Sequence, residues 1–278
     1  MDEVSSHPVF ALNHIAAPKL SPRRLFQLAQ SLGLGAVEIR NDLDGNAIAD
    51  GTPAGELRAL AAAAGQRIAT INALQRFNDW TAARAREAIE LADYAHAAGV
   101  AALVLVPVND GSGRRDGERQ ANLRTALSAL KPILEARGIL GFVEPLGFET
   151  SSLRSKREVV EAIEAAGAQE RFRLVHDTFH HCLAGEPALF AAMTGLVHIS
   201  GVTDPGVAVE GMRDPHRVLV DARDRLGTLD QMRALIGQGY RGLFSFEPFA
   251  PEVQALDDPA AAISASMESI GASLARGA

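Results

Sequence analysis

Four short apolar runs in the second half of the sequence each deliver a side chain that can bind a metal ion. Each run is typical of a β-strand, and the metal-binding side chain comes at its C-terminal end. The four residues are Glu144, Asp177, His198 and Glu247. If the four strands are neighbours in one parallel sheet, their ends lie together. We therefore predict that these side chains converge on one divalent cation.

This donor set indicates a particular chemistry. Three carboxylates placed together repel one another, and their pKa values rise unless a cation lies between them. Three oxygen ligands and one imidazole suit Mn²⁺, Mg²⁺, Co²⁺ or Zn²⁺, and ligand type does not choose among these ions. The set leaves coordination positions open, as a catalytic site does. Taken singly, each acid could equally cap a helix or lie at the surface, so the prediction depends on all four together.

The order of elements along the chain predicts how these residues are positioned. The predicted strands cover residues 9–15, 36–39, 67–73, 101–108, 139–143, 171–175, 196–199 and 243–246. The predicted helices cover residues 22–33, 52–65, 81–98, 118–137, 155–166, 187–193, 228–236 and 259–275. Strands that alternate with helices imply parallel pairing. Repeating units of about 33 residues predict an α/β protein, a closed (β/α)₈ TIM barrel with residues 1–278 as a single domain.

An open, doubly wound sheet is the competing architecture, but no Gly-x-Gly-x-x-Gly follows any predicted strand. In a closed barrel the C-terminal strand ends surround one opening, where active sites lie. The alternation of side chains agrees with this placement, since Phe142 and Glu144 share one face of their strand, and Ser245 and Glu247 share one face of theirs. If that face is the lumen, the four ligands meet.

Other polar residues near predicted strand ends are candidates for substrate binding. His180, three residues after Asp177, could bind substrate hydroxyls, orient a ligand or cap a helix. Arg40 could hold a substrate oxygen or pair with Glu38 on the same face. Trp80 could pack against a sugar-like ring or belong to the core. The further candidates are Asn13 and Asn72 at strand ends and Arg223 in the long loop 204–225, which could instead form a local salt bridge.

Composition limits the classes of partner. The formal charge of −7 disfavours a nucleic-acid backbone, because phosphate binding needs a basic surface. No apolar run reaches about 18 residues, and residues 1–8 do not resemble a signal peptide, so we expect no membrane partner. Cys182 is the one cysteine, which excludes an internal disulfide and is compatible with the cytoplasmic location we expect. The expected partner is a small molecule, and the sequence leaves a homo-oligomer open.

The residues around the predicted ligands resemble a known superfamily. The strand-end set, with His180, resembles the xylose-isomerase-like barrels of sugar isomerases and epimerases. Within that superfamily, three segments look most like bacterial inosose (2-keto-myo-inositol) isomerases. They are Val-Glu-Pro-Leu-Gly-Phe-Glu-Thr-Ser-Ser at 143–152, His-Asp-Thr-Phe-His-His at 176–181 and His-Ile-Ser-Gly-Val at 198–202. The resemblance covers nearly the whole chain.

The resemblance implies that Glu144 and Glu247 bind metal and also form the acid/base pair, with Asp177 and His198 as the remaining ligands. Ketose epimerases of the superfamily commonly place another glutamate six residues after the strand-five one. Here Glu149 follows Glu144 by five residues and in a different sequence context, so we do not assign it the role of that second glutamate. Glu149 could line the opening or cap a helix.

These observations predict an enzyme, a metal-dependent isomerase of inositol metabolism. It would shift a carbonyl within a cyclic polyol ketone, with inosose as the leading substrate, through a metal-stabilised enediolate. No nicotinamide or flavin is required. The alternatives are a ketose 3-epimerase, a dehydratase of the same barrel type, and a polyol-binding barrel without turnover.

Overall fold

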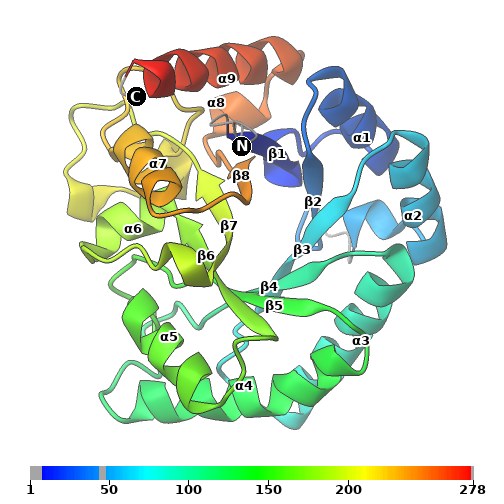
Figure 1. Cartoon of the computed structure of the whole chain (residues 1–278), viewed down its shortest axis with the longest axis vertical. Coiled ribbons are helices and arrows are strands. Elements are labelled where there is room, and N and C mark those ends of the chain that lie inside the picture. Colours follow the sequence, from blue (N-terminus) through cyan, green and yellow to red (C-terminus); the bar gives the residue numbers. More distant parts are fainter. Residues whose placement is uncertain (1–7, 44–47, 277–278) are drawn as a thin grey trace, which may run out of the picture.

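A computed structural model describes residues 8–43 and 48–276, and in it parallel strands close into a barrel in which each strand pairs with the next and β8 pairs with β1 (Figure 1). The strands are β1 Val9–Asn13, β2 Ala36–Arg40, β3 Ile68–Gln75, β4 Ala102–Val106, β5 Leu140–Val143, β6 Phe172–Asp177, β7 Thr194–Ile199 and β8 Leu243–Phe246. The predicted (β/α)₈ architecture is confirmed.

Helices form a ring outside the strands (Figure 1). They are α1 Pro22–Ser31, α2 Ala54–Ala63, α3 Ala82–Ala98, α4 Glu118–Glu135, α5 Lys156–Ala165, α6 Thr178–Ala184, α7 Thr228–Gly237, α8 Pro251–Gln254 and α9 Pro259–Ala275. Short 3₁₀ helices occur at His14–Ala16 (η1), Ala49–Gly51 (η2), Ala191–Met193 (η3), Val209–Gly211 (η4) and Asp214–His216 (η5). Within the described residues, none of the helices is both long and apolar enough to cross a membrane.

Helix-capping chemistry explains where the predicted boundaries were right. The Thr81 hydroxyl accepts a hydrogen bond from the backbone N–H of Arg84 and begins α3, and Gly99 ends that helix in the left-handed conformation. Ser155 caps α5 in the same way, by accepting from the N–H of Glu158. The third, fourth and fifth predicted helices therefore agree closely with the structure.

The predicted helix at residues 187–193 was wrong. The helix that follows β6 begins directly at Thr178, because the carboxylate of Asp177 accepts from the backbone N–H groups of Phe179 and His180. Gly185, with a φ of 64°, ends that helix after seven residues. Only the 3₁₀ turn η3 lies in the predicted interval. His180 therefore belongs to a helix that starts inside the site.

Two apolar cores hold the strands in place. The larger lies between the outer face of the barrel and the helices, with Leu, Ile, Val and Phe side chains from both layers. The smaller fills the lumen below the site and is built from small residues around Phe142. Gly195 is required there, since a Cβ at that position would lie 2.7 Å from the Phe142 ring. The lumen is thus filled from below, and the strand ends carry the site.

The outer face of β6 carries a buried polar network. His176 alternates with Asp177 and points outward, as predicted. Lys156 at the start of α5 lies with its Nζ 3.1 Å from His176 Nδ1 and 2.6 Å from His181 Nδ1. The other ring nitrogen of His176 lies 2.9 Å from Oε1 of Gln231 on α7. Burial, followed by the charge of Lys156, lowers the pKa of His181 from 6.5 to about 4.

This network predicts an acid-sensitive fold. The unfolded chain takes up the His181 proton near pH 6.5 and the folded chain only near pH 4. Between these values the unfolded state holds more protons, so the free energy of unfolding falls as the pH decreases. On acidification, we expect the free energy of unfolding of H181Q to fall by roughly 1–2 kcal/mol less than that of the wild type. This figure allows for solvent screening of the partly exposed His181 ring.

Urea unfolding at pH 7 and pH 4.5 measures this dependence. The matched control is H96Q, at an exposed histidine on α3 whose Nδ1 meets only a backbone carbonyl. If H181Q and H96Q lose stability equally on acidification, the network does not exclude protons as described.

Candidate metal centre and active site

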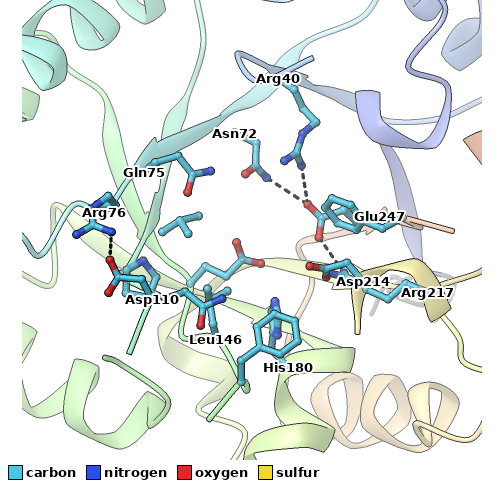
Figure 2. A pocket seen from close by; sticks show the side chains of 16 residues that line it. Arg40, Asn72, Gln75, Arg76, Asp110, Leu146, His180, Asp214, Arg217 and Glu247 are labelled. Carbon is cyan, nitrogen blue, oxygen red and sulfur yellow. Dashed lines mark hydrogen bonds and ion pairs between the residues drawn. The ribbon is translucent and has the colours of Figure 1, made fainter. Parts of the chain in front are cut away.

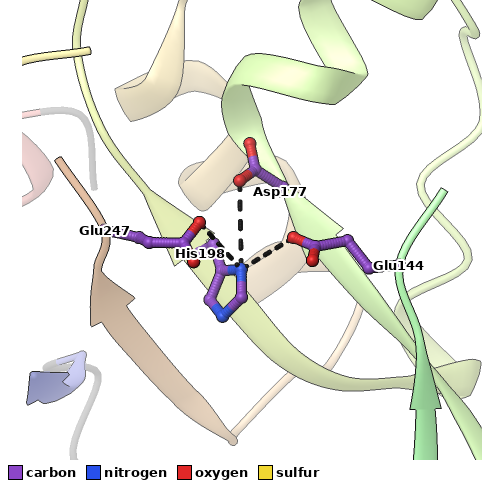
Figure 3. A group of neighbouring side chains, drawn as sticks. All are labelled: Glu144, Asp177, His198 and Glu247. Atoms are coloured by element: carbon purple, nitrogen blue, oxygen red, sulfur yellow. Dashed lines mark hydrogen bonds and ion pairs between the residues drawn. The ribbon is translucent and has the colours of Figure 1, made fainter. Parts of the chain in front are cut away.

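The structure brings the four predicted ligands together. One donor atom from each of Glu144, Asp177, His198 and Glu247 lies within 4.8 Å of the other three, and all four residues are buried (Figure 3). Nδ1 of His198 is the common centre. It lies 2.8 Å from Glu144 Oε1, 3.2 Å from Glu247 Oε2 and 3.9 Å from Asp177 Oδ2. Each of the three carboxylates therefore turns one oxygen toward the same point.

The other ring nitrogen of His198 is held by a carboxylate that sequence analysis did not assign to the site. His198 Nε2 lies 3.1 Å from Oε2 of Glu38 on β2, and that oxygen also accepts from the Thr70 hydroxyl at 2.6 Å. Burial by itself would raise the pKa of Glu38, but His198 and neighbouring hydroxyls outweigh it and hold the pKa at about 2. An ionised Glu38 keeps Nε2 of His198 protonated, which presents Nδ1 to the other three donors.

Glu38 does not form an ion pair with Arg40. Sequence analysis had offered that pair as an alternative to substrate binding by Arg40. The Arg40 guanidinium instead donates to both oxygens of Asp42, at 2.8 and 2.7 Å, and to Glu247 Oε1 at 3.0 Å. The sequence signal for Glu38 was its shared face with Arg40 on β2. What the sequence could not show is that this face points at an imidazole from β7.

Asp177 serves two purposes with its two oxygens. Oδ1 accepts from the backbone N–H groups of Phe179 and His180 and so caps α6. Oδ2 faces His198 and accepts from Arg217 Nη2 at 2.6 Å. Burial would raise the pKa of this carboxyl, but Arg217 and the surrounding imidazoles hold it below its usual range. The helix-cap and site-ligand interpretations of Asp177 are therefore compatible.

Arg217 is the main residue that sequence analysis missed. It lies in the long loop after β7, where Arg223 had been nominated. Its Nη2 donates to Asp177 Oδ2 at 2.6 Å and to Glu247 Oε2 at 2.9 Å, and the side chain is fully buried. Its backbone carbonyl accepts from the N–H groups of Phe249 and Ala250 after β8. A usable signal was the apolar run Val218–Val220 directly after it, which predicts a buried segment.

Glu247 is held from the opposite side by groups from the first three strands. Its Oε1 accepts from Arg40 Nη1 at 3.0 Å and from Asn72 Nδ2 at 3.5 Å (Figure 2). It also accepts from Asn13 Nδ2 at 3.1 Å. Burial raises the pKa of Glu247 to about 8, with Glu144 adding to the rise and His198, Arg217 and Arg40 opposing it. This carboxyl therefore changes protonation state more readily than an exposed glutamate does near neutral pH.

A cavity of about 370 Å³ opens above these residues. Figure 2 shows Arg40, Asn72 and Glu247 at one end and the Arg76–Asp110 ion pair, 2.6 Å between Nη1 and Oδ2, at the other. Glu144, Glu247, His180 and Arg217 also line the cavity, whereas His198 and Asp177 do not. Of the four donors, the two glutamates alone face the cavity. The other two lie beneath it.

The predicted substrate-binding residues divide into two groups. Arg40, Asn72 and His180 line the cavity, and Asn13 lies just below, against Glu247. Trp80 packs against the main core, and Arg223 pairs with Asp221 through an exposed side chain, so neither is at the cavity. We therefore omit Trp80 and Arg223 from the site. Burial lowers the pKa of His180, and among the described residues nothing partners its Nδ1.

The donor set fits a divalent cation. Ligands that share an ion at ~2.0–2.2 Å lie at most about 4.4 Å apart, close to the 4.8 Å spread found here. The outer oxygens of Asp177 and Glu247 are held by the helix cap and by the Arg40–Asn13–Asn72 group. The inward oxygens both accept from Arg217 Nη2, so a cation would share them with this guanidinium. Metal binding requires a neutral His198. The carboxylates around it outweigh burial and raise its pKa well above the usual value, so the cation must displace a proton.

The fold and this site define a family. Residues 26–272 match the model of the family described as xylose isomerase-like TIM barrel, so the chain belongs to that family. The structure is also similar to that of a xylose isomerase domain containing protein from Salmonella typhimurium LT2. The two chains are 33% identical, with a TM-score of 0.87 and 96% of each chain covered. No curated protein sequence matches the chain.

More distant solved structures share the fold. One is the IolI protein with a bound zinc atom, at 18% identity and a TM-score of 0.81, covering 96% of this chain and 98% of that one. Another is the 3-keto-D-glucoside 4-epimerase YcjR from E. coli, at 18% identity and a TM-score of 0.66, with 95% and 98% covered. A third is an L-ribulose 3-epimerase, at 19% identity and a TM-score of 0.70, with 97% and 95% covered.

We expect the chain to bind one divalent ion per molecule and D177N to weaken that binding. Asparagine can still cap α6 through its carbonyl oxygen but lacks the charge that faces the ion. The loss of affinity should exceed the ~10–100-fold typical of removing an outer partner of a ligand. Calorimetric titration with Zn²⁺ and with Mn²⁺ measures it, and affinity should rise with pH as the His198 proton is displaced. D221N, at an exposed aspartate, is the control; equal affinities in the two variants would contradict the assignment.

A second prediction concerns the imidazole. E38Q keeps the volume and a hydrogen-bond acceptor for Nε2 of His198 but removes the charge that orients the ring. We expect metal affinity to fall by ~10–100-fold with little change in fold. E56Q on the exposed face of α2 is the matched control, and circular dichroism verifies folding. Unchanged affinity in E38Q would limit Glu38 to a packing role.

Proposed function

We propose that this protein is a divalent-metal-dependent isomerase that moves a carbonyl within a polyol ketone, with inosose as the leading substrate. The observation that carries the proposal is the division within the donor set. Glu144 and Glu247 line the cavity, while Asp177 and His198 lie beneath it. Two groups can thus reach both the cation and the substrate, and two can only hold the cation.

The residues that would hold the cation are Glu144, Asp177, His198 and Glu247. When bound, a divalent cation would polarise the substrate carbonyl and its neighbouring hydroxyl and so acidify the C–H between them. The zinc in the structure of the IolI protein, which shares this fold, supports a metal here. Elemental analysis of the purified protein identifies the ion.

The two glutamates would transfer the proton. Figure 3 shows Glu144 and Glu247 approaching His198 from opposite sides. One carboxylate removes the acidified proton from the substrate, and the other group returns a proton to the neighbouring carbon. Without a cation, burial raises the pKa of Glu247 to about 8, and a bound cation would lower it and favour the carboxylate form that a base requires. Arg40, Asn13 and Asn72 keep its carboxylate in position.

The rest of the cavity supports an uncharged, hydroxylated substrate. Arg40, Arg76 and Arg217, the arginines among the described residues that line this cavity, are each already paired with a carboxylate, which disfavours a phosphate. Neutral His180 can exchange hydrogen bonds with a hydroxyl, which would partner its Nδ1 or its other ring nitrogen. Resemblance of residues 143–152, 176–181 and 198–202 to inosose isomerases favours inosose over open-chain sugars.

A 3-epimerase of a ketose is the second candidate, and one observation favours it. Carboxylates on opposite sides of a centre can remove a proton from one face of a carbon and return it to the other, which inverts that carbon. The fold likeness to an L-ribulose 3-epimerase and a 3-keto-D-glucoside 4-epimerase agrees with this alternative. The two candidates differ in the carbon that receives the proton.

Incubation with inosose in D₂O distinguishes these functions. The isomerase exchanges deuterium at the carbon next to the carbonyl and produces a new ketone, both visible by NMR. A 3-epimerase incorporates deuterium with inversion and without moving the carbonyl. A dehydratase gives a product with new ultraviolet absorbance. A polyol-binding barrel without turnover gives no exchange even with metal supplied, which would contradict the proposal.

E144Q should abolish most of this exchange while the fold is retained. Loss of one acid–base group removes about 10²–10⁴-fold in rate, and a lost metal ligand adds to that. Calorimetric titration run beside the exchange assay separates the two effects. E252Q, at an exposed glutamate on α8, should exchange deuterium at the wild-type rate. Substantial activity in E144Q would remove Glu144 from the mechanism.

A further inference from the structure

A second cavity lies beside the active-site cavity and equals it in size, about 370 Å³. The two share three lining residues, Asn109, Phe148 and Asp214. The second cavity contains none of the four metal-site donors. It extends between the loop after β5, the end of α6 and the turn η4. The two cavities together therefore offer about twice the volume of the active-site cavity alone.

The walls of the second cavity are built by specific contacts. Arg154 donates to the backbone carbonyls of Gly147 at 3.0 Å and Leu183 at 3.1 Å, which ties the loop after β5 to α6. Gly147 is packed so closely against α6 that a Cβ there would lie 2.3 Å from the His180 carbonyl oxygen. This wall is preformed, as is usual for small-molecule sites.

Phe148 stands at the junction of the two cavities. Its ring makes T-shaped contacts with Phe179, at 5.8 Å between centroids, and with His180, at 5.1 Å. These contacts hold a half-buried aromatic ring in one orientation between the two spaces. An aromatic ring fixed in this way can pack against the C–H face of a sugar ring while the hydroxyls point elsewhere.

The remaining lining combines apolar and acidic groups. Leu183 and Val209 add apolar surface, and Glu149, Glu210 and Asp214 add hydrogen-bond acceptors. The two arginines of this cavity are engaged with backbone carbonyls, Arg154 as above and Arg213 with those of Glu210 and Met212. Three carboxylates line this cavity beside two guanidiniums, and Asp214 also pairs with Arg217 at 3.3 Å. This excess of negative charge in the lining disfavours a phosphate or carboxylate. The lining suits a neutral group with several hydroxyls.

We propose that the substrate has two hydroxylated rings: a ketone ring above Glu144 and Glu247, and a second, uncharged sugar ring in the neighbouring cavity, joined by a glycosidic bond that passes Phe148. This inference rests on the proposed function for the first ring and adds the class of the whole substrate. Each cavity is near the lower end of the ~300–1,000 Å³ range of ligand sites, and together they match a two-ring ligand.

Binding of unreactive analogues tests the second cavity without relying on turnover. The first pair of probes is myo-inositol and its α-galactoside, galactinol. The second pair is methyl β-glucoside and cellobiose. Calorimetric titration of the metal-loaded protein should give an affinity for at least one two-ring probe that is about tenfold or more above its one-ring parent. If neither two-ring probe outbinds its parent, the inference is wrong.

Substitutions locate the effect. L183W and V209W place bulk in the second cavity at residues that do not line the first, and each should abolish the advantage of the two-ring probe while leaving the one-ring affinity unchanged. Two positions are used so that one variant that fails to fold does not decide the result. I89W, at an exposed residue on α3, is the matched control. A two-ring advantage that survives in a folded L183W or V209W would place the second ring elsewhere.

The outcome is independent of the proton-transfer assay. Deuterium exchange with inosose together with equal binding of the one-ring and two-ring probes keeps the proposed function and overturns the two-ring substrate. Preferred binding of a two-ring probe that is lost in L183W, together with no exchange of any ketone, keeps the second cavity as a sugar site and overturns the isomerase.

Discussion

Four carboxylates buried at one end of a barrel are the constraint on which the rest of this structure depends. Glu38, Glu144, Asp177 and Glu247 come from four different strands and would repel one another strongly in so dry a place. His198 stands among them, and Arg40 and Arg217 approach from two sides. A cluster of this composition gains nothing as a core over apolar side chains. A divalent cation bound among these carboxylates would offset their mutual repulsion.

Local hydrogen bonds position the carboxylates of Asp177, Glu247 and Glu38. The start of α6 takes one oxygen of Asp177, and the first three strands supply the donors that take one oxygen of Glu247. The Thr70 hydroxyl and the His198 ring hold Glu38. The loop after β7 returns through a pair of hydrogen bonds between Gly201 and Val218, which brings Arg217 over the centre. Each contact is weak alone, but together they leave three oxygens facing one point.

The four donors differ in their position relative to the cavity. His198 and Asp177 do not line the cavity, whereas Glu144 and Glu247 do. The loop after β5 extends the enclosed space past Phe148, and it is fixed to α6 by Arg154 rather than left open to solvent. A second cavity with these fixed walls would favour a ligand of matching size and shape, and its balance of charges would favour a neutral one.

The sequence by itself determined the barrel, because alternating strands and helices in repeating units leave few closed arrangements. It also predicted that Glu144, Asp177, His198 and Glu247 converge, since each ends a strand and parallel strand ends in a barrel must meet. It could not assign Arg217 or Glu38, whose roles arise from contacts with residues distant along the chain. Nor could it place α6, which begins at the Asp177 cap and not within residues 187–193, or exclude Trp80 and Arg223. Those outcomes depend on which side chains meet across the barrel and on how loops return to it, and only the packed structure decides that.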